Sequence, residues 1–432
     1  MQIIITIFRQ DNFVPTYSRY STSGPTATAS PVPAQQPDGD RRQTDWGQVV
    51  FGLSLSCFVA FQQFKLPPLL PDLLTEFRYS PTMAGSFMSV YALVGLIASV
   101  PMGRWLRRHG YRPGLLIGLV AAALGLLIAL GLARFTGAML LARGLEGLTY
   151  AIFAIAGPVV ATEAARTRDL PLVTGLLAGW IPIGQIGAGL LALALPDWRA
   201  IWLLALALTA ALAIPSWRYR NHRPAGRAAG SAAKPQPGAK AANLFSAAIF
   251  LLWSGQYFAF MTWLTQFLIE RHHLDPHRAV LVYLIPVVVL LGFNVITGWA
   301  LGRGLRVGPA LLVCLLLQAG IWASISLLDG LAGLVALVVY GICAGVTPTC
   351  LFHLPHLIAA NQGTGTRAGP EAFGTLMAGR NIGVFLGPLV LPEILAYSGN
   401  WDLAANVIAV ATLLAGFIVL LLGRHLRRPQ EG

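Results

Sequence analysis

Residues Gly114 to Leu132 read GLLIGLVAAALGLLIALGL and consist only of Gly, Ala, Leu, Ile and Val. A helix of about 20 such residues crosses the roughly 30 Å hydrocarbon core of a bilayer. Residues Leu311 to Leu328, LLVCLLLQAGIWASISLL, have the same character, and ten further runs of the chain are similar. The runs lack the alternation of polar and apolar residues typical of membrane β-barrel strands. The sequence therefore predicts an all-α membrane protein with twelve transmembrane helices.

The composition favours the same class of protein. Hydrophobic residues make up 56% of the chain, charged residues 11%, and the mean hydropathy is +0.66, whereas about 25% of residues are charged in soluble proteins. The net charge of +13 could suggest a nucleic-acid partner. The arginines lie in short loops rather than on one face of a helix, however, and no nucleic-acid motif accompanies them. We therefore expect a lipid bilayer, and no nucleic acid, as the partner of this chain.

The apolar runs fall into two sets of six, separated by a segment rich in Pro, Gly, Ala and basic residues. The expected helices are 46–74, 82–103, 113–133, 136–161, 171–195 and 199–216, followed by 244–268, 278–301, 308–328, 331–358, 371–396 and 401–423. The predicted domains are a disordered tail (1–45), a first six-helix bundle (46–216), a linker (217–243), a second bundle (244–423) and a basic tail (424–432).

The basic residues predict the orientation of the helices. Eighteen lysines and arginines beside the predicted helices fall on one side of the membrane, and the other side has only Arg78, Arg134, Arg199, Arg271 and Arg278. Cytoplasmic loops carry such an excess, so both termini are expected in the cytoplasm. Arginine greatly exceeds lysine in number, which favours a bacterial protein and hence its inner membrane.

The two sets of helices look like copies of one another. Gly157-Pro158 near the end of the fourth helix precedes Glu163 at the spacing with which Thr347-Pro348 precedes His353 in the tenth. Likewise Leu-Leu-Ala-Gly179 in the fifth helix matches Leu-Met-Ala-Gly379 in the eleventh. Repeated halves with a binding site between them are a common construction of secondary transporters.

The loop after the second helix reads Gly103-Arg-Trp-Leu-Arg107-Arg108-His-Gly110-Tyr-Arg112. It resembles the loop of the major facilitator superfamily (MFS), although the family usually has Asp where this chain has Arg107. Arg143-Gly-Leu-Glu146-Gly147 in the fourth helix is similar to the family's Arg-x-x-x-Gly pattern. The resemblance implies two pseudo-symmetric six-helix bundles and a cytoplasmic gate. The expected gate residues are Gly103, Arg107, Arg108, Gly110, Arg112, Glu163 and His353.

Charged residues inside the bilayer are expensive and mark candidate sites. Arg143 and Glu146 are three residues apart on one helix and share a face, so they can form a structural pair or a functional one. Lys65 and Arg380 have no partner that the sequence reveals, which favours contact with a substrate. The residues expected to bind the substrate are Lys65, Arg143, Arg380, Gln62, Gln256, Asn294, Tyr340 and Asn381.

Glycines are dense in the fifth and eleventh predicted helices, and small residues let membrane helices approach closely. We expect these glycines to pack where the two bundles meet: Gly175, Gly179, Gly184, Gly187 and Gly189 in the fifth helix, and Gly379, Gly383 and Gly387 in the eleventh.

The cations inside the bilayer outnumber Glu146, so the hypothesis is a secondary transporter that carries a small organic anion. Proton symport through Glu146 is the expected coupling. The expected partners are the small-molecule substrate and protons, and we expect a functional monomer without a cofactor or a metal. Proton-driven drug efflux is the alternative, and a non-transporting receptor or assembly factor on the same scaffold is a second one. A nitrate-type porter is disfavoured because the second and eighth helices lack intramembrane arginines, and an enzyme is disfavoured because no nucleophile or phosphate-binding motif occurs.

Overall fold

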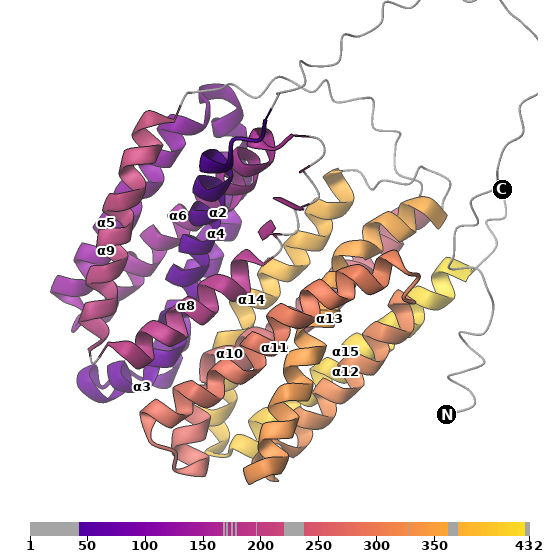
Figure 1. Ribbon diagram of the computed structural model, residues 1–432. Helices are drawn as coiled ribbons and strands as arrows, with labels where there is room; N and C mark the ends of the chain where they lie inside the picture. Colours follow the sequence, from indigo (N-terminus) through magenta and orange to yellow (C-terminus); the bar gives the residue numbers. More distant parts are fainter. Residues whose placement is uncertain are drawn as a thin grey trace, which may run out of the picture.

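The computed structural model describes residues 43–166, 169, 172–173, 176–177, 179–195, 197–219, 237–327, 329–361 and 370–427. The predicted disordered tail up to residue 42, most of the predicted linker and the end of the basic tail lie outside these residues. Within them the regular structure is entirely helical (Figure 1).

The helices form two bundles that lie side by side (Figure 1). The first half consists of α2 (Trp46–Phe64), α3 (Leu66–Phe77), α4 (Pro81–His109), α5 (Tyr111–Leu132), α6 (Thr136–Ala164), α8 (Trp180–Ala194) and α9 (Trp198–Arg218). The second half consists of α10 (Pro237–His272), α11 (Pro276–Gly302), α12 (Val307–Ser324), the short η1 (Ile325–Leu327), α13 (Gly330–Asn361), α14 (Pro370–Ser398) and α15 (Trp401–Arg427). Eleven described spans are long and apolar enough to cross a membrane, and α8 is a shorter apolar helix. The predicted twelve-helix fold class is confirmed.

The first predicted helix corresponds to one apolar span, Trp46–Phe77, but the helix is interrupted within it, which the sequence analysis did not predict. It is divided at Lys65 into α2 and α3. Pro67 and Pro68 follow the break, and a proline has no N–H to donate to the carbonyl four residues earlier. The carbonyls of Gln63 and Phe64 therefore receive no helical hydrogen bond from Pro67 and Pro68. A new helix, α3, begins at Leu66 with both prolines in its first turn. The break places a lysine at the joint between two helices.

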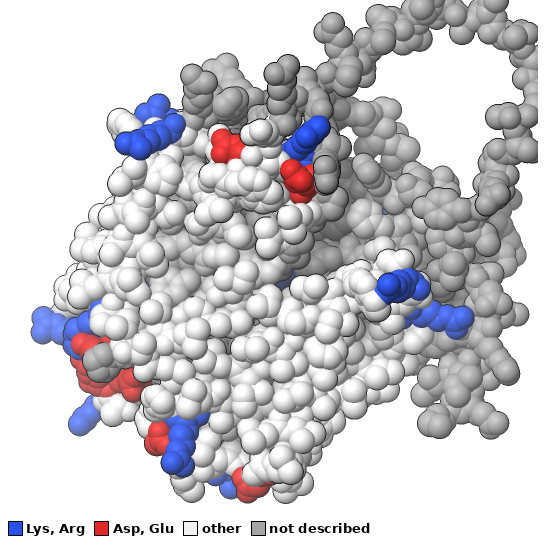
Figure 2. Space-filling model, viewed as in Figure 1, with Lys and Arg blue, Asp and Glu red and all other residues white. Residues whose placement is uncertain are grey.

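Charged side chains gather at the two ends of the bundle, and a broad band without charge lies between them (Figure 2). We call the end that carries the described chain ends, near residue 43 and Arg427, the termini face, and the opposite end the far face. At the termini face Asn361 donates to the carbonyl of Leu426 over 2.9 Å. At the far face Arg199 forms an ion pair with Glu76. The uncharged band is the surface that the lipid chains cover.

The glycines of α14 lie within the second half, so the expectation that they join the halves was wrong. A Cβ atom at Gly379, Gly383 or Gly387 would collide with the backbone of α10. Gly184 likewise packs against α2 within the first half, and a Cβ at Gly187 would meet none of the described atoms of its neighbours within 4 Å. Two of the expected glycines do face the other half: a Cβ at Gly189 would collide with Leu284 of α11, and a Cβ at Gly179 would lie 3.4 Å from Leu291 of the same helix. Gly175 lies outside the described residues.

The two halves meet tightly toward the far face. Gly85 of α4 packs against the carbonyl of Pro388 in α14. One turn further along, the Ser89 hydroxyl donates to the Phe385 carbonyl over 2.7 Å. The Thr265 hydroxyl of α10 donates to the Pro67 carbonyl of α3 over 2.8 Å. We call these contacts the far seam. These contacts close the described conformation at the far face.

Candidate functional site between the halves

A glutamine of the first half is held between two tyrosines of the second. The Tyr257 hydroxyl of α10 donates to Gln185 Oε1 over 3.1 Å, and Gln185 Nε2 donates to the Tyr283 hydroxyl of α11 over 2.8 Å. All three side chains are buried. The sequence analysis missed Gln185, although a lone amide within the apolar run of α8 was an available signal. These hydrogen bonds make the centre of the interface polar.

Arg380 lies beside this polar centre. Its side chain is only 7% exposed, and its Nη1 donates to Asn381 Oδ1 over 3.0 Å. The guanidinium carbon is 5.9 Å from the centre of the Phe258 ring. Phe258 in turn stacks on Phe64 of the first half, with ring centres 5.6 Å apart. Arg380 therefore adjoins the interface, as the sequence analysis required of a substrate-binding residue.

The charge of Arg380 is not neutralised nearby. No carboxylate of the described residues lies within the 4.0 Å ion-pair distance of its nitrogens. Trp253 of α10 also has a donor without a partner: its buried Nε1 makes no hydrogen bond among the described residues. Its ring stacks on that of Tyr257, with ring centres 5.3 Å apart. This part of the interface thus offers hydrogen-bond donors and positive charge.

The other intramembrane charges form a separate centre inside the first half. Glu146 bridges two cations: one carboxylate oxygen is 2.7 Å from Lys65 Nζ, and the other pairs with Arg143. The expected contact of Arg143 with Glu146 is therefore present. Lys65 also donates to Gln62 Oε1 over 2.8 Å. The inference that Lys65 lacks a partner was wrong, because its partner comes from a helix 81 residues away in sequence.

This charge centre is sealed in the described conformation. The side chains of Lys65, Arg143 and Glu146 are at most 1% exposed. Arg143 also donates to the carbonyls of Phe87 and Gln62, over 3.1 and 2.9 Å. Helices α2, α4 and α6 thus surround the charges, and the ring of Trp202 in α9 covers Lys65 Nζ at 4.3 Å. With two cations and one anion the centre has a net charge of +1.

Three further residues expected to bind the substrate lie in the second half. Gln256 Oε1 accepts hydrogen bonds from Tyr340 and Trp322, each over 2.8 Å. Gln256 and Tyr340 are buried, so the structure brings these two together inside the second half. Asn294 of α11 is half-buried and accepts a hydrogen bond from Thr349 of α13 over 3.2 Å.

The expected gate residues lie at the termini face. Gly110 joins α4 to α5 with φ +87° and ψ 171°, a conformation that only glycine adopts readily. The guanidinium of Arg112 lies 5.0 Å from the centre of the Trp217 ring, within the first half. Arg108 is exposed, and Gly103 lies within α4. The side chain of Arg107 lies outside the described part of the structure.

Glu163 and His353 occupy matching ends of α6 and α13. Glu163 is exposed and His353 is half-buried, with its ring centre 6.2 Å from that of His356. Their role in a gate stays a prediction.

Comparison with known proteins supports one family. Residues 52–369 match the family model described as Major Facilitator Superfamily. The chain is 33% identical over 128 residues to the class B tetracycline resistance protein of Escherichia coli. That alignment covers 29% of this chain and 30% of the relative. It is 30% identical over 158 residues to the putative uncharacterized transporter YgaY of Escherichia coli K12, covering 35% of this chain and 39% of the relative.

These alignments thus reach only about a third of the length of the curated relatives. A crystal structure of the nucleoside transporter NupG (D323A mutant) aligns with a TM-score of 0.66 over 86% of this chain and 99% of that one. At 15% identity this likeness shows the fold alone.

Proposed function

Because the chain belongs to the Major Facilitator Superfamily, we propose that it is a secondary active transporter that moves a small organic anion by alternating access. Arg380 is the observation that carries this proposal, since it is a buried cation beside the interface without an acidic partner in the described residues. An uncompensated charge inside a membrane protein costs several kcal/mol. A carboxylate substrate would supply the missing negative charge.

The surroundings of Arg380 favour an anion over a cation. The first half contributes a centre with net positive charge, and the nearby Trp253 Nε1–H is an unused donor. A hydrogen bond to a charged group contributes about 1.5–3 kcal/mol. One such bond between a substrate carboxylate and Arg380 would therefore strengthen binding of the substrate by this amount. The stacked rings of Trp253 and Tyr257 offer apolar area for the body of an organic molecule.

We further propose that protons drive transport through Glu146. A proton on this carboxylate would weaken its hold on Lys65. Lys65 is the joint between α2 and α3, and the carbonyl of Pro67, two residues later, accepts the far-seam hydrogen bond from Thr265. Release of Lys65 from Glu146 would therefore weaken the Thr265–Pro67 hydrogen bond that helps to close the far face.

The proposed setting is the inner membrane of a bacterium, with the termini face in the cytoplasm and the monomer as the functional unit. The excess of lysine and arginine in the loops of that face supports the orientation.

The test is transport into proteoliposomes under an imposed proton gradient. The probes are a panel of aliphatic and aromatic mono- and dicarboxylates, with tetracycline as a separate probe. Accumulation of a carboxylate, abolished by a protonophore, is the expected result. Arg380→Gln should weaken the apparent affinity for the carboxylate strongly, and Arg380→Lys should weaken it less. Arg134→Gln, a change at an exposed arginine of the far face, should not affect it. Transport of no carboxylate would refute the anion proposal.

Drug efflux is the second candidate, because three of the relatives are named tetracycline resistance proteins. Its distinguishing result in the same vesicles is proton-driven movement of tetracycline that Arg380→Gln leaves unchanged. Cells that express the chain would then also tolerate more tetracycline than cells that express Glu146→Gln.

A further inference from the structure

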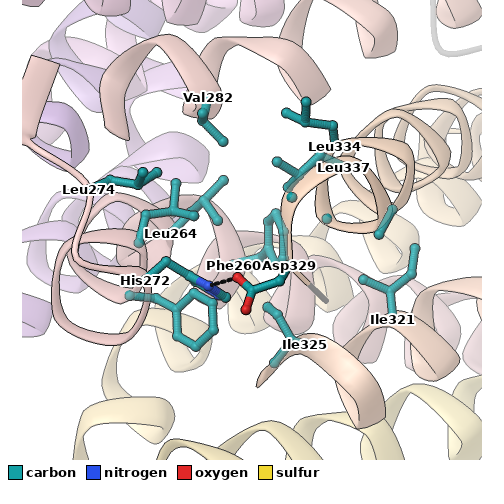
Figure 3. A pocket seen from close by; sticks show the side chains of 15 residues that line it. Phe260, Leu264, His272, Leu274, Val282, Ile321, Ile325, Asp329, Leu334 and Leu337 are labelled. Atoms are coloured by element: carbon teal, nitrogen blue, oxygen red, sulfur yellow. Dashed lines mark hydrogen bonds and ion pairs between the residues drawn. The ribbon is translucent and has the colours of Figure 1, made fainter. Parts of the chain in front are cut away.

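The second half contains a cavity of about 300 Å³ near the far face, at the lower end of the roughly 300–1,000 Å³ of ligand pockets. It lies between the end of α10, the first turns of α11, the end of α12 and the start of α13 (Figure 3). Its walls include Leu264, Val282, Ile321 and Leu337, and Phe260 lies at its inner end. The cavity is distinct from the interface, because all of its lining residues belong to the second half.

The polar side chains of the described lining are confined to one place. His272 Nδ1 at the end of α10 lies 2.7 Å from Asp329 Oδ1, just before α13 (Figure 3). Asp329 is 85% exposed, whereas His272 is 12% exposed. The pair therefore marks the mouth toward the far face, and the remaining lining is hydrocarbon or glycine backbone. An organic anion inside would lose its hydration without gaining a partner, so the cavity does not suit the proposed substrate.

Part of the lining is exposed at the surface of the second half. Leu334 lines the cavity and is 41% exposed. Leu331, three residues earlier on the same helix, is 77% exposed. From Leu264 to His272 the helix rises by about 12 Å at 1.5 Å per residue, so the cavity reaches from the end of the helix into the depth of the lipid chains. Its occupant can thus enter from the bilayer.

The inner end of the cavity is rigid. Phe260 stacks on Tyr340 with ring centres 3.9 Å apart, and it meets Trp322 edge-on at 5.4 Å. Both partners are in turn fixed by hydrogen bonds to Gln256. A preformed apolar site loses little free energy to ordering when it is filled.

From this geometry we propose that the cavity is a lipid site that takes one acyl chain of a membrane phospholipid, with the headgroup at the His272–Asp329 mouth. Arg271 precedes His272 in the last turn of α10 and is exposed, and none of the ion pairs of the described residues includes it. A positive charge thus lies at the same end of α10 as the mouth, where the phosphate of a phospholipid would lie. This site does not depend on the proposed transport function.

Native mass spectrometry of the purified chain, titrated with palmitoyl-oleoyl phosphatidylglycerol, tests the proposal. The variants Leu264→Trp and Leu337→Trp fill the cavity, and Leu316→Trp changes an exposed leucine of α12 outside it. We expect the wild type and Leu316→Trp to retain one phospholipid at a concentration at least tenfold lower than either filled variant requires. Equal retention by all four proteins would overturn the proposal.

Two further measurements use the unchanged chain, so that a folding defect of a variant cannot decide the matter. A phospholipid with a photoreactive diazirine in its acyl chain should label peptides that contain residues 264–282 or 321–337, and labelling confined to other segments would contradict the site. The second measurement is competition between palmitate and the phospholipid. If palmitate binds in the cavity and the phospholipid does not displace it, the occupant of the cavity is not a phospholipid.

Discussion

Replacing Glu146 by glutamine tests the charge centre of the first half, since it keeps the shape of the side chain and removes the only anion. The net charge of the centre rises from +1 to +2, with Lys65 and Arg143 still buried. Removal of one partner from a buried pair costs about 3–5 kcal/mol. Both cations keep neutral acceptors, Gln62 Oε1 for Lys65 and two backbone carbonyls for Arg143. We therefore expect a loss near the lower limit, about 3 kcal/mol.

A second substitution isolates the electrostatic part of that loss. In Glu146→Gln/Lys65→Met the net charge returns to +1, so the double variant should be more stable than Glu146→Gln by at least about 1 kcal/mol. The free energy of unfolding is measured by titration with SDS in mixed micelles, followed by circular dichroism. Glu393→Gln, at an exposed glutamate of α14, is the control and should change stability by less than about 0.5 kcal/mol. A Glu146→Gln variant as stable as this control would refute the argument.

Two glycines give further predictions. Gly85→Val should hold the far seam open, because the new side chain would collide with a carbonyl of α14. Spin labels at Asp72 and Arg271 should then report a longer distance across the far face than in the wild type. An unchanged distance would show that Gly85 does not help to close the far seam. Gly110→Ala should lower the free energy of unfolding by about 1–3 kcal/mol, because φ is +87° there. Gly103→Ala is its control, since a Cβ there would have its nearest neighbour at an ordinary 3.6 Å; equal effects of the two changes would contradict the strain argument.

The fold class could be predicted because hydropathy and length decide it. Runs such as 114–132 have one stable solution in a bilayer, a spanning helix, and the structure has it. The pair Arg143–Glu146 was also within reach, because a spacing of three residues on a helix places both on one face. The break at Lys65 could have been found from the two prolines that follow it.

Contacts between distant helices could not be predicted in this way. Lys65 and Glu146 are brought together by the packing of α2 on α6, which no local pattern encodes. For the same reason the glycines of α14 were assigned to the wrong neighbour: a small residue reveals that a helix approaches closely, but not which one. The partners of Gln185 were out of reach for the same reason, since its two tyrosines lie on helices of the other half.

The most direct test of the account is proton-driven uptake of the transported carboxylate by Arg380→Gln, compared with Arg380→Lys at equal protein content in the vesicles. The loss of one charged hydrogen bond, about 1.5–3 kcal/mol, corresponds to a roughly 10- to 100-fold weaker apparent affinity, at 1.4 kcal/mol for each factor of ten. Arg380→Lys should stay between this value and that of the wild type. Uptake by Arg380→Gln with the affinity of the wild type would contradict the claim that Arg380 binds the anion.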